Sequence, residues 1–429
     1  MSTPELPRIV TDQVPGPRSL ALASRLADVE SPDTTYLSAD FPVFWESGSG
    51  CIVTDVDGNT FLDAAASFGA LSVGHSHPAV VDAVENQART LIHGMGDVHP
   101  SRVKVELLET IAAYVPLPDP RIILGQSGAE SVESALKTAL LATGRAGVLA
   151  FDGGYHGLTY GTLEPTSRAL FRDPFVRQRG RFTRHLPFAC DIPTVERELA
   201  NGEIGAVIVE PIQGRGGIKI APDGWLTDLQ RACHAHGALL IVDEIYTGWG
   251  RTGKLFGSQW EGPGFAPDLL CVGKAMGGGM PISACVGSAA LIERAWPRSS
   301  GEAIQTSTFL GHPVSCAAAV AAIRTIVDEN LAERADIQGT YFLAQLNNLA
   351  QAFPNIIADV RGRGLMIGMQ LATPDLAKRL MLAMLRVGLI VLLAGDRGDV
   401  VEITPPLIIS KAQIEWIVSH LAPYFDHLS

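Results

Sequence analysis

Five short segments of this 429-residue chain are almost wholly apolar, and patterns typical of helices separate them. Strands that are buried on both faces of a parallel sheet have this composition, because helices cover both sides of such a sheet. The alternation of strand and helix therefore predicts an α/β fold with a mostly parallel central sheet. The five predicted strands are residues 121–124, 148–151, 206–209, 239–242 and 269–272.

One helix is marked at both ends. Ser127, followed three residues later by Glu130, has the form of a capping box at a helix start. Apolar residues then repeat at helical spacing over 132–140, and Gly144 is typical of a helix end. The small loop before this helix would present backbone N–H groups at a helix N-terminus, where an anion such as phosphate binds favourably.

The rest of the chain differs from this central region. Residues 50–63 alternate around a turn and predict a β-hairpin. Helical patterns dominate after about residue 325, with strand-like segments between them. We therefore expect an N-terminal arm with part of a small domain (1–70), a large domain (71–325) and a C-terminal small α/β domain (326–429).

The composition excludes several classes of partner. The formal net charge is −12 and basic residues are scattered, which argues against binding to nucleic acid. The sequence has no secretory signal and no long apolar helix, so we expect a cytoplasmic protein without a membrane partner. Six cysteines without a C-x-x-C pair fit buried free thiols. The histidines of 233–236 suit a surface helix, and we expect no metal site.

Charged residues follow three of the five predicted strands. Glu210 follows 206–209, Asp243 follows 239–242, and Lys274 comes two residues after 269–272. Ligands of open α/β sheets bind beyond the carboxyl ends of the strands, so these side chains would face one crevice. A single charged residue can simply mark where a strand meets water, but three neighbouring strands favour a shared site.

The segment after residues 148–151 adds an aromatic ring to this site. Two glycines precede Tyr155, so the backbone could pass close to a ligand and the ring could stack on a flat cofactor. A lysine, a carboxylate, a phosphate cradle and a stacking ring together suit pyridoxal 5′-phosphate (PLP). This cofactor needs a lysine for its Schiff base and an acid that keeps its ring nitrogen protonated.

The sequence resembles the class III aminotransferases from about residue 41 to the C-terminus. The resemblance implies an aspartate-aminotransferase-like fold and PLP as cofactor. It also implies ping-pong transfer of an amino group from a small-molecule donor to a keto or aldehyde acceptor, in a homodimer with shared active sites. The matching motifs, in chain order, are Ser127-Gly128-Ala129-Glu130, Tyr155-His156-Gly157, Glu210-Pro211-Ile212-Gln213-Gly214, Asp243-Glu244-Ile245, Gly250-Arg251-Thr252-Gly253, residues 273–281, Thr308-Phe309, Gly311-His312-Pro313 and residues 360–365.

The resemblance also implies a role for each matching residue. Lys274 would form the Schiff base and move the proton, Asp243 would face the pyridine nitrogen, and Glu210 would be an orienting carboxylate. The implied cofactor contacts are Ser127, Gly128 and Ala129 at the phosphate, Tyr155 and Ile245 on the two faces of the ring, His156 and Tyr246 beside it, and Thr308 reaching the phosphate from the second subunit.

Two positions depart from the family pattern. Many members have glutamine at the position of Tyr246, where it reaches the cofactor's phenolic oxygen; the tyrosine hydroxyl could substitute, or the contact could be lost. Many members have arginine at the position of Glu402, where it holds a substrate carboxylate, and a glutamate cannot do this. We expect a substrate that lacks this carboxylate or binds it elsewhere, such as a cationic amine, an amino sugar or an amino-acid amide.

Alternatives remain at this site. Glu402 could instead form a structural salt bridge, and Phe68 is a further candidate for the substrate pocket. Residues 398–408 also resemble a branch of the family that racemises or epimerises amino-acid amides, lactams or free amino acids. Racemisation needs proton access to both cofactor faces, and Tyr155 would cover the face that Lys274 does not serve. A non-catalytic PLP-binding protein is disfavoured by the presence of both Lys274 and Asp243.

Overall fold

The centre of the protein is a seven-stranded sheet in the order β4-β12-β11-β10-β7-β5-β6. A computed structural model describes residues 6–427 of the chain. Neighbouring strands run parallel except at β12, which is antiparallel to both β11 and β4. All five segments predicted as strands lie in this sheet, and the mostly parallel α/β fold is confirmed. The strands are β4 (Pro120–Gly125), β5 (Gly147–Phe151), β6 (Thr183–Leu186), β7 (Ile204–Val209), β10 (Leu239–Asp243), β11 (Leu269–Val272) and β12 (Ser283–Ser288).

Helices cover both faces of this sheet. Alternate residues of β7 enter different apolar clusters: Ala206 and Ile208 meet α5 (Gly128–Thr143) and α10 (Ala289–Ala295). Val207 and Val209 join the cluster on the other face. Every residue of β7 is therefore buried, which explains its wholly apolar sequence. The other helices packed around the sheet are α3 (Pro78–Thr90), α4 (Arg102–Tyr114), α8 (Ile192–Leu199), α9 (Trp225–Ala235) and α11 (Pro313–Asp328).

Helix α5 begins at the predicted residue, but only one half of the predicted capping box forms. The Ser127 hydroxyl accepts a hydrogen bond from the Glu130 backbone N–H at 3.3 Å, as expected. The Glu130 carboxylate, however, accepts from the backbone N–H of Gln126 at 2.9 Å, so the reciprocal half of the predicted capping box does not form with Ser127. The helix ends at Gly144, whose φ of 69° lies in the left-handed region that favours glycine.

Two smaller sheets combine the beginning and the end of the chain. The predicted hairpin is confirmed as β2 (Ile52–Asp55) and β3 (Thr60–Asp63), which pair antiparallel beside β1 (Trp45–Ser49). Strand β15 (Leu389–Ile390) completes this sheet and pairs parallel with β3. The other sheet, antiparallel in the order β13-β14-β17-β16, consists of β13 (Ile357–Arg363), β14 (Met366–Leu371), β16 (Leu392–Ala394) and β17 (Val400–Ile403).

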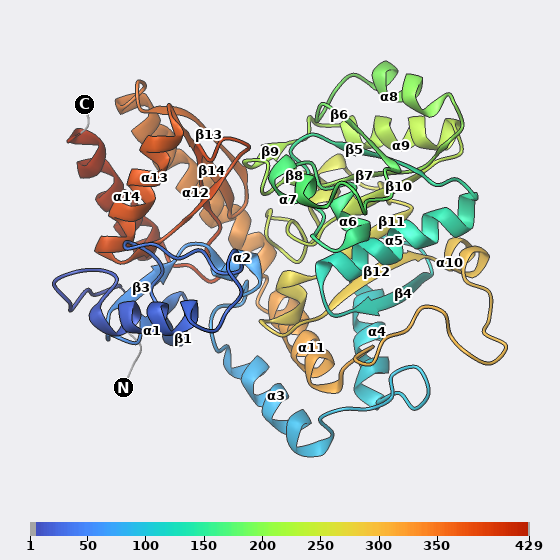
Figure 1. Cartoon of the computed structure of the whole chain (residues 1–429), viewed down its shortest axis with the longest axis horizontal. Helices are drawn as coiled ribbons and strands as arrows, with labels where there is room; N and C mark the ends of the chain where they lie inside the picture. The colour runs from blue at the N-terminus through green and yellow to red at the C-terminus, as the bar shows by residue number, and fades with distance from the viewer. Residues whose placement is uncertain (1–5, 428–429) are drawn as a thin grey trace.

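Figure 1 shows the blue N-terminal and red C-terminal segments together on one side of the central part. This agrees with a small domain built from both ends, although the boundaries at residues 70 and 325 stay a prediction. The helices of this side are α1 (Pro17–Ala27), α12 (Leu331–Ala352), α13 (Pro374–Val387) and α14 (Lys411–Asp426). The remaining short elements are α2 (Ala66–Gly69), α6 (Tyr160–Leu163), α7 (Ala169–Arg172), β8 (Ile212–Gln213), β9 (Lys219–Ile220) and the 3₁₀ turns η1 (Asp173–Phe175), η2 (Gly257–Glu261) and η3 (Lys274–Gly277).

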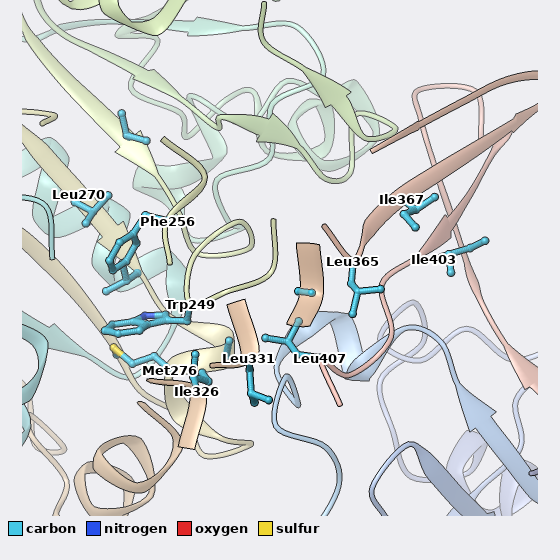
Figure 2. Packing of buried hydrophobic residues seen from close by; sticks show 14 of the residues in the cluster. Trp249, Phe256, Leu270, Met276, Ile326, Leu331, Leu365, Ile367, Ile403 and Leu407 are labelled. Atoms are coloured by element: carbon cyan, nitrogen blue, oxygen red, sulfur yellow. The ribbon is translucent and has the colours of Figure 1, made fainter. Parts of the chain in front are cut away.

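One apolar core runs through both sides of the molecule. Figure 2 shows Trp249 and Phe256 next to each other and close to Leu270 of β11. Their ring centroids are 5.1 Å apart. Leu365 and Leu407 continue the cluster toward the antiparallel sheet. Within this core the buried guanidinium of Arg251 donates to the hydroxyl of Ser72 at 3.0 Å and to the carbonyls of Leu365 and Pro405. Among residues 6–427, no helix combines the length and apolarity that crossing a membrane requires.

Candidate active site

The carboxyl ends of β7, β10 and β11 bring together the three charged residues that the sequence singled out. Asp243 ends β10, Glu210 follows β7, and Lys274 opens η3 directly after β11. The groups interact electrostatically: burial lowers the pKa of Lys274, and the negative charges of Glu402, Glu210 and Asp243 oppose this shift. Lys274 has a φ of 43°, in a left-handed region that costs non-glycine residues about 1–3 kcal/mol and is often found at functional sites.

Asp243 is paired with a histidine. Its Oδ2 lies 2.7 Å from Nδ1 of His156, and its Oδ1 accepts a hydrogen bond from the Ile245 backbone N–H at 3.1 Å. Both side chains are buried. Burial opposes protonation of His156, but the hydrogen bond and charge of Asp243 prevail and raise its pKa. The histidine expected beside the cofactor is thus in contact with the carboxylate of Asp243.

Glu210 organises two backbone segments. One carboxylate oxygen accepts from the N–H of Tyr155 at 2.9 Å, and the other accepts from the N–H of Gly214 at 3.2 Å. Burial raises the pKa of Glu210 to about 7. The two hydrogen bonds agree with an orienting role, because they hold the segment of Tyr155 and the loop after β8 in fixed positions.

The N-terminus of α5 forms a tight cradle. A Cβ added at Gly128 would lie 2.9 Å from Cδ1 of Ile245, and one added at Gly157 would lie 2.7 Å from Cβ of Ala129. Ser127, at the helix start, is exposed. The close packing brings the segments of the predicted cradle, the Tyr155 loop and Ile245 together. It leaves small residues and free N–H groups at a helix N-terminus, which suits a phosphate.

Tyr246 lies directly beside Lys274. The lysine Nζ is 3.6 Å from the centroid of the tyrosine ring. The tyrosine hydroxyl donates a hydrogen bond to the carboxylate of Glu402 and lies 3.0 Å from Oγ1 of Thr404. Because the hydroxyl is engaged there, the geometry favours loss of the contact that glutamine makes in many class III members.

Glu402 of β17 thus belongs to the same site as Lys274. Its side chain is only 2% exposed, and it forms no ion pair with any residue in the described range 6–427. Burial raises the pKa of Glu402, while the hydrogen bond from Tyr246 and the charge of Lys274 act in the opposite direction. The structural salt bridge that the sequence left open is absent from this part of the chain.

Two predicted residues lie outside this cluster. Thr308 is exposed in the loop before α11. Phe68 is 57% exposed and has a φ of 61°. It borders a cavity of about 200 Å³ that Trp45 and Ser67 also line.

Sequence reasoning missed two features of the site. Gly69 and Gly214 lie against opposite edges of the Tyr246 ring, at distances that leave no room for a side chain. Arg215 places its guanidinium carbon 6.0 Å from the ring centroid of Tyr155. The signal for Arg215 was a single cation within a glycine-rich segment, directly after the matched motif 210–214.

Comparison with known proteins identifies the family that has these features. Residues 36–424 match the family model of class III aminotransferases. The chain is a class III aminotransferase. It is 37% identical over 382 residues to the acetylornithine aminotransferase of Methanopyrus kandleri, an alignment that covers 89% of this chain and 94% of that protein.

Solved structures of related enzymes agree. An ornithine aminotransferase of Toxoplasma gondii, described with partial occupancy of PLP at its active site, has a TM-score of 0.85 at 28% identity, covering 94% of this chain and 93% of that one. An acetylornithine aminotransferase of Elizabethkingia anophelis has a TM-score of 0.80 at 29% identity, covering 95% and 99%. The cofactor of this aminotransferase is PLP, and the cradle at α5, the carboxylate of Asp243 and the amine of Lys274 suit its phosphate, ring nitrogen and aldehyde.

Proposed function

We propose that this aminotransferase binds PLP covalently through Nζ of Lys274, with Asp243 at the pyridine nitrogen. When bound, PLP supplies an electron-withdrawing ring that stabilises negative charge on the substrate carbon. Asp243 is suited to a position at the ring nitrogen because its contacts with the Ile245 backbone N–H and with His156 hold its carboxylate in place. The lowered pKa of Lys274 favours its free amine, which can accept a proton from the substrate carbon and return it.

The other contacts follow from the packing around this pair. The N–H groups at Ser127, Gly128 and Ala129 would bind the phosphate, while Tyr155 and Ile245 would enclose the cofactor ring. Thr308 would complete the phosphate site from a second subunit of a homodimer. Large apolar side chains that are exposed near the loop of Thr308 and before α4 support this assembly; they are Met95 (56%), Val98 (63%), Ile304 (81%) and Phe309 (53%).

Glu402 supports a substrate class. A buried carboxylate beside Lys274, without an ion pair among residues 6–427, is a suitable partner for a positively charged group of the substrate. The amino donor would therefore carry a second cation, as a diamine does, and no carboxylate at this position. The enzyme would pass the amino group of this donor to a keto or aldehyde acceptor in a ping-pong reaction. We also propose a cytoplasmic location, which the six free cysteines support.

Three amino donors with the same four-carbon chain test this proposal. The PLP-loaded enzyme is given 1,4-diaminobutane, butylamine or 4-aminobutanoate without an acceptor, and the change in cofactor absorbance is followed. We expect the diamine to react best and 4-aminobutanoate worst, with differences of roughly 10–100-fold in kcat/KM, since hydrogen bonds to charged groups contribute about 1.5–3 kcal/mol. The absorbance should return when a keto acid is added.

Variants at one position separate recognition from chemistry. Glu402→Gln should remove most of the preference for the diamine over butylamine, and Glu402→Arg should improve 4-aminobutanoate relative to the diamine. Glu333→Gln removes the same charge from an exposed position of α12 and should change neither ratio. Unchanged selectivity in Glu402→Arg would refute the substrate class. Loss of optical activity in an enantiopure substrate, with no amino transfer, would indicate racemisation instead.

A further inference from the structure

A guanidinium at the site lacks an anionic partner. Within residues 6–427 the half-buried side chain of Arg215 forms no hydrogen bond and no ion pair. A neighbouring arginine is engaged by contrast: Arg361 donates to the carbonyls of Gly217 and Ile218, and it also pairs with Asp359. No donor of the Arg215 side chain is used within this range, so its guanidinium can donate to a ligand.

The backbone of Arg215 is fixed although its side chain is free. The N–H of Gly217 donates to the carbonyl of Gly214 at 3.0 Å and closes a turn around Arg215. The N–H of Gly214 is held by Glu210 at 3.2 Å, and the carbonyl of Arg215 accepts from the N–H of Gly395 at 2.9 Å. This loop thus presents the guanidinium from a rigid support, which reduces the entropy lost when a ligand binds.

The guanidinium lies beside an aromatic ring of the site. It lies 6.0 Å from the ring of Tyr155, measured from its Cζ to the ring centroid. Its charge also acts on the two central groups: together with burial it lowers the pKa of Lys274, and it opposes the effect of burial on the pKa of Glu402. An anion bound by Arg215 would therefore lie beside Tyr155 and within electrostatic range of Lys274.

We propose that Arg215 binds the carboxylate of the amino acceptor, a 2-oxo acid, and is a specificity-determining residue of this aminotransferase. The planar fork of a guanidinium matches a carboxylate with two parallel hydrogen bonds. This proposal rests on the amino transfer proposed above and adds the residue that recognises the acceptor. Glu402 would serve the cationic donor in one half-reaction, and Arg215 would serve the anionic acceptor in the other.

The first test measures binding without chemistry. Glutarate, a dicarboxylate that lacks the reactive keto group, is titrated into the PLP-loaded enzyme by calorimetry. We expect Arg215→Met to weaken its binding at least 10-fold and Arg215→Lys to give an intermediate affinity, because an ammonium offers no planar fork. Arg397→Met, which removes an exposed cation paired with Asp399 in the neighbouring loop, should leave the affinity unchanged. Undetectable binding to wild type, or equal affinity in Arg215→Met, would overturn the proposal.

The second test compares acceptors. The acceptor half-reaction is measured with a 2-oxo acid that the wild-type enzyme accepts and with propanal, which has no carboxylate. Arg215→Met should lower kcat/KM at least 10-fold for the 2-oxo acid, mainly through KM, and leave propanal unaffected. An equal loss with both acceptors would mean that Arg215 is only structural and would overturn the proposal.

Two controls distinguish this proposal from others. If Arg215 instead neutralised the cofactor's phosphate, Arg215→Met would lower the affinity for PLP, measured by equilibrium dialysis, and spare the glutarate titration. If no donor and acceptor pair supported amino transfer at all, the proposed function would fail. The glutarate titration would still show whether Arg215 is a carboxylate site, because it requires no reaction.

Discussion

Gly214→Ala tests how tightly the Tyr246 ring is confined. The added Cβ would lie 2.5 Å from Cδ1 and 2.9 Å from Cε1 of the ring. Either the new Cβ or the ring must therefore move about 1 Å to reach a normal contact of roughly 3.5 Å. The ring cannot move away freely, because Gly69 lies against its opposite edge. The φ of Gly214 is not positive, so the backbone itself accepts alanine.

The expected effect follows from two opposing contributions. Overpacking of this kind destabilises by about 1–3 kcal/mol. Replacing glycine by alanine stabilises by about 0.4–1 kcal/mol through the unfolded chain. We therefore expect a net loss of roughly 1–2 kcal/mol in the free energy of unfolding, measured by urea denaturation of the cofactor-free protein.

A second background isolates the clash. In Tyr246→Ser the ring is absent, so Gly214→Ala should there be neutral or slightly stabilising. The double-mutant cycle should then give a coupling energy of about 1–3 kcal/mol between the two positions. If Gly214→Ala destabilises the protein equally in both backgrounds, the clash with the ring is not the cause and the reasoning is refuted.

Three further predictions follow from other contacts. His156→Asn should reduce the free energy of unfolding most at low pH. The folded pKa of His156 is raised, so its pair with Asp243 stabilises the protein fully below about pH 6.5 and this contribution is lost as the pH rises through the folded pKa. Unfolding of the wild type and the variant, measured between about pH 5.5 and 9, would show this. Gly128→Ala should weaken PLP binding, measured by equilibrium dialysis, by roughly 10-fold or about 1.4 kcal/mol, because its Cβ would push against Ile245; unchanged affinity would exclude this cradle. Gly339→Ala should destabilise the protein despite a helix-propensity gain of about 1 kcal/mol, because its Cβ would lie 1.9 Å from the backbone oxygen of Gly364. The control Thr340→Ala, at the next and exposed position, introduces no clash and should not lower the free energy of unfolding.

The central sheet could be predicted because its strands are encoded locally. A strand buried on both faces must be apolar throughout, so β7 and β11 are recognisable without any neighbour. The rule that sites form at the carboxyl ends of parallel strands then places Glu210, Asp243 and Lys274 together. No information from elsewhere in the chain is needed for either step.

What could not be predicted depends on which groups meet in space. Whether Arg215 has a partner depends on segments near residues 155, 274 and 402, and none of them is close to it in the sequence. In the same way, the partner of the Glu130 carboxylate is Gln126 rather than Ser127, a choice between neighbours that the local motif does not determine. The pairing of Tyr246 with Glu402 joins residues 156 positions apart.

The parallel pairing of β3 with β15 has a consequence for how the chain is made. Leu62 is translated long before its partner Leu389, and at 5–20 residues per second the interval is roughly 16–65 s. Arg8 pairs with Thr60 on this edge of β3, but throughout this time the N–H of Leu62, which binds the carbonyl of Gly388 in the folded protein, has no partner, so this part of the edge is open. A polypeptide released before residue 389 would keep that open edge permanently, and such edges are where chains associate into aggregates.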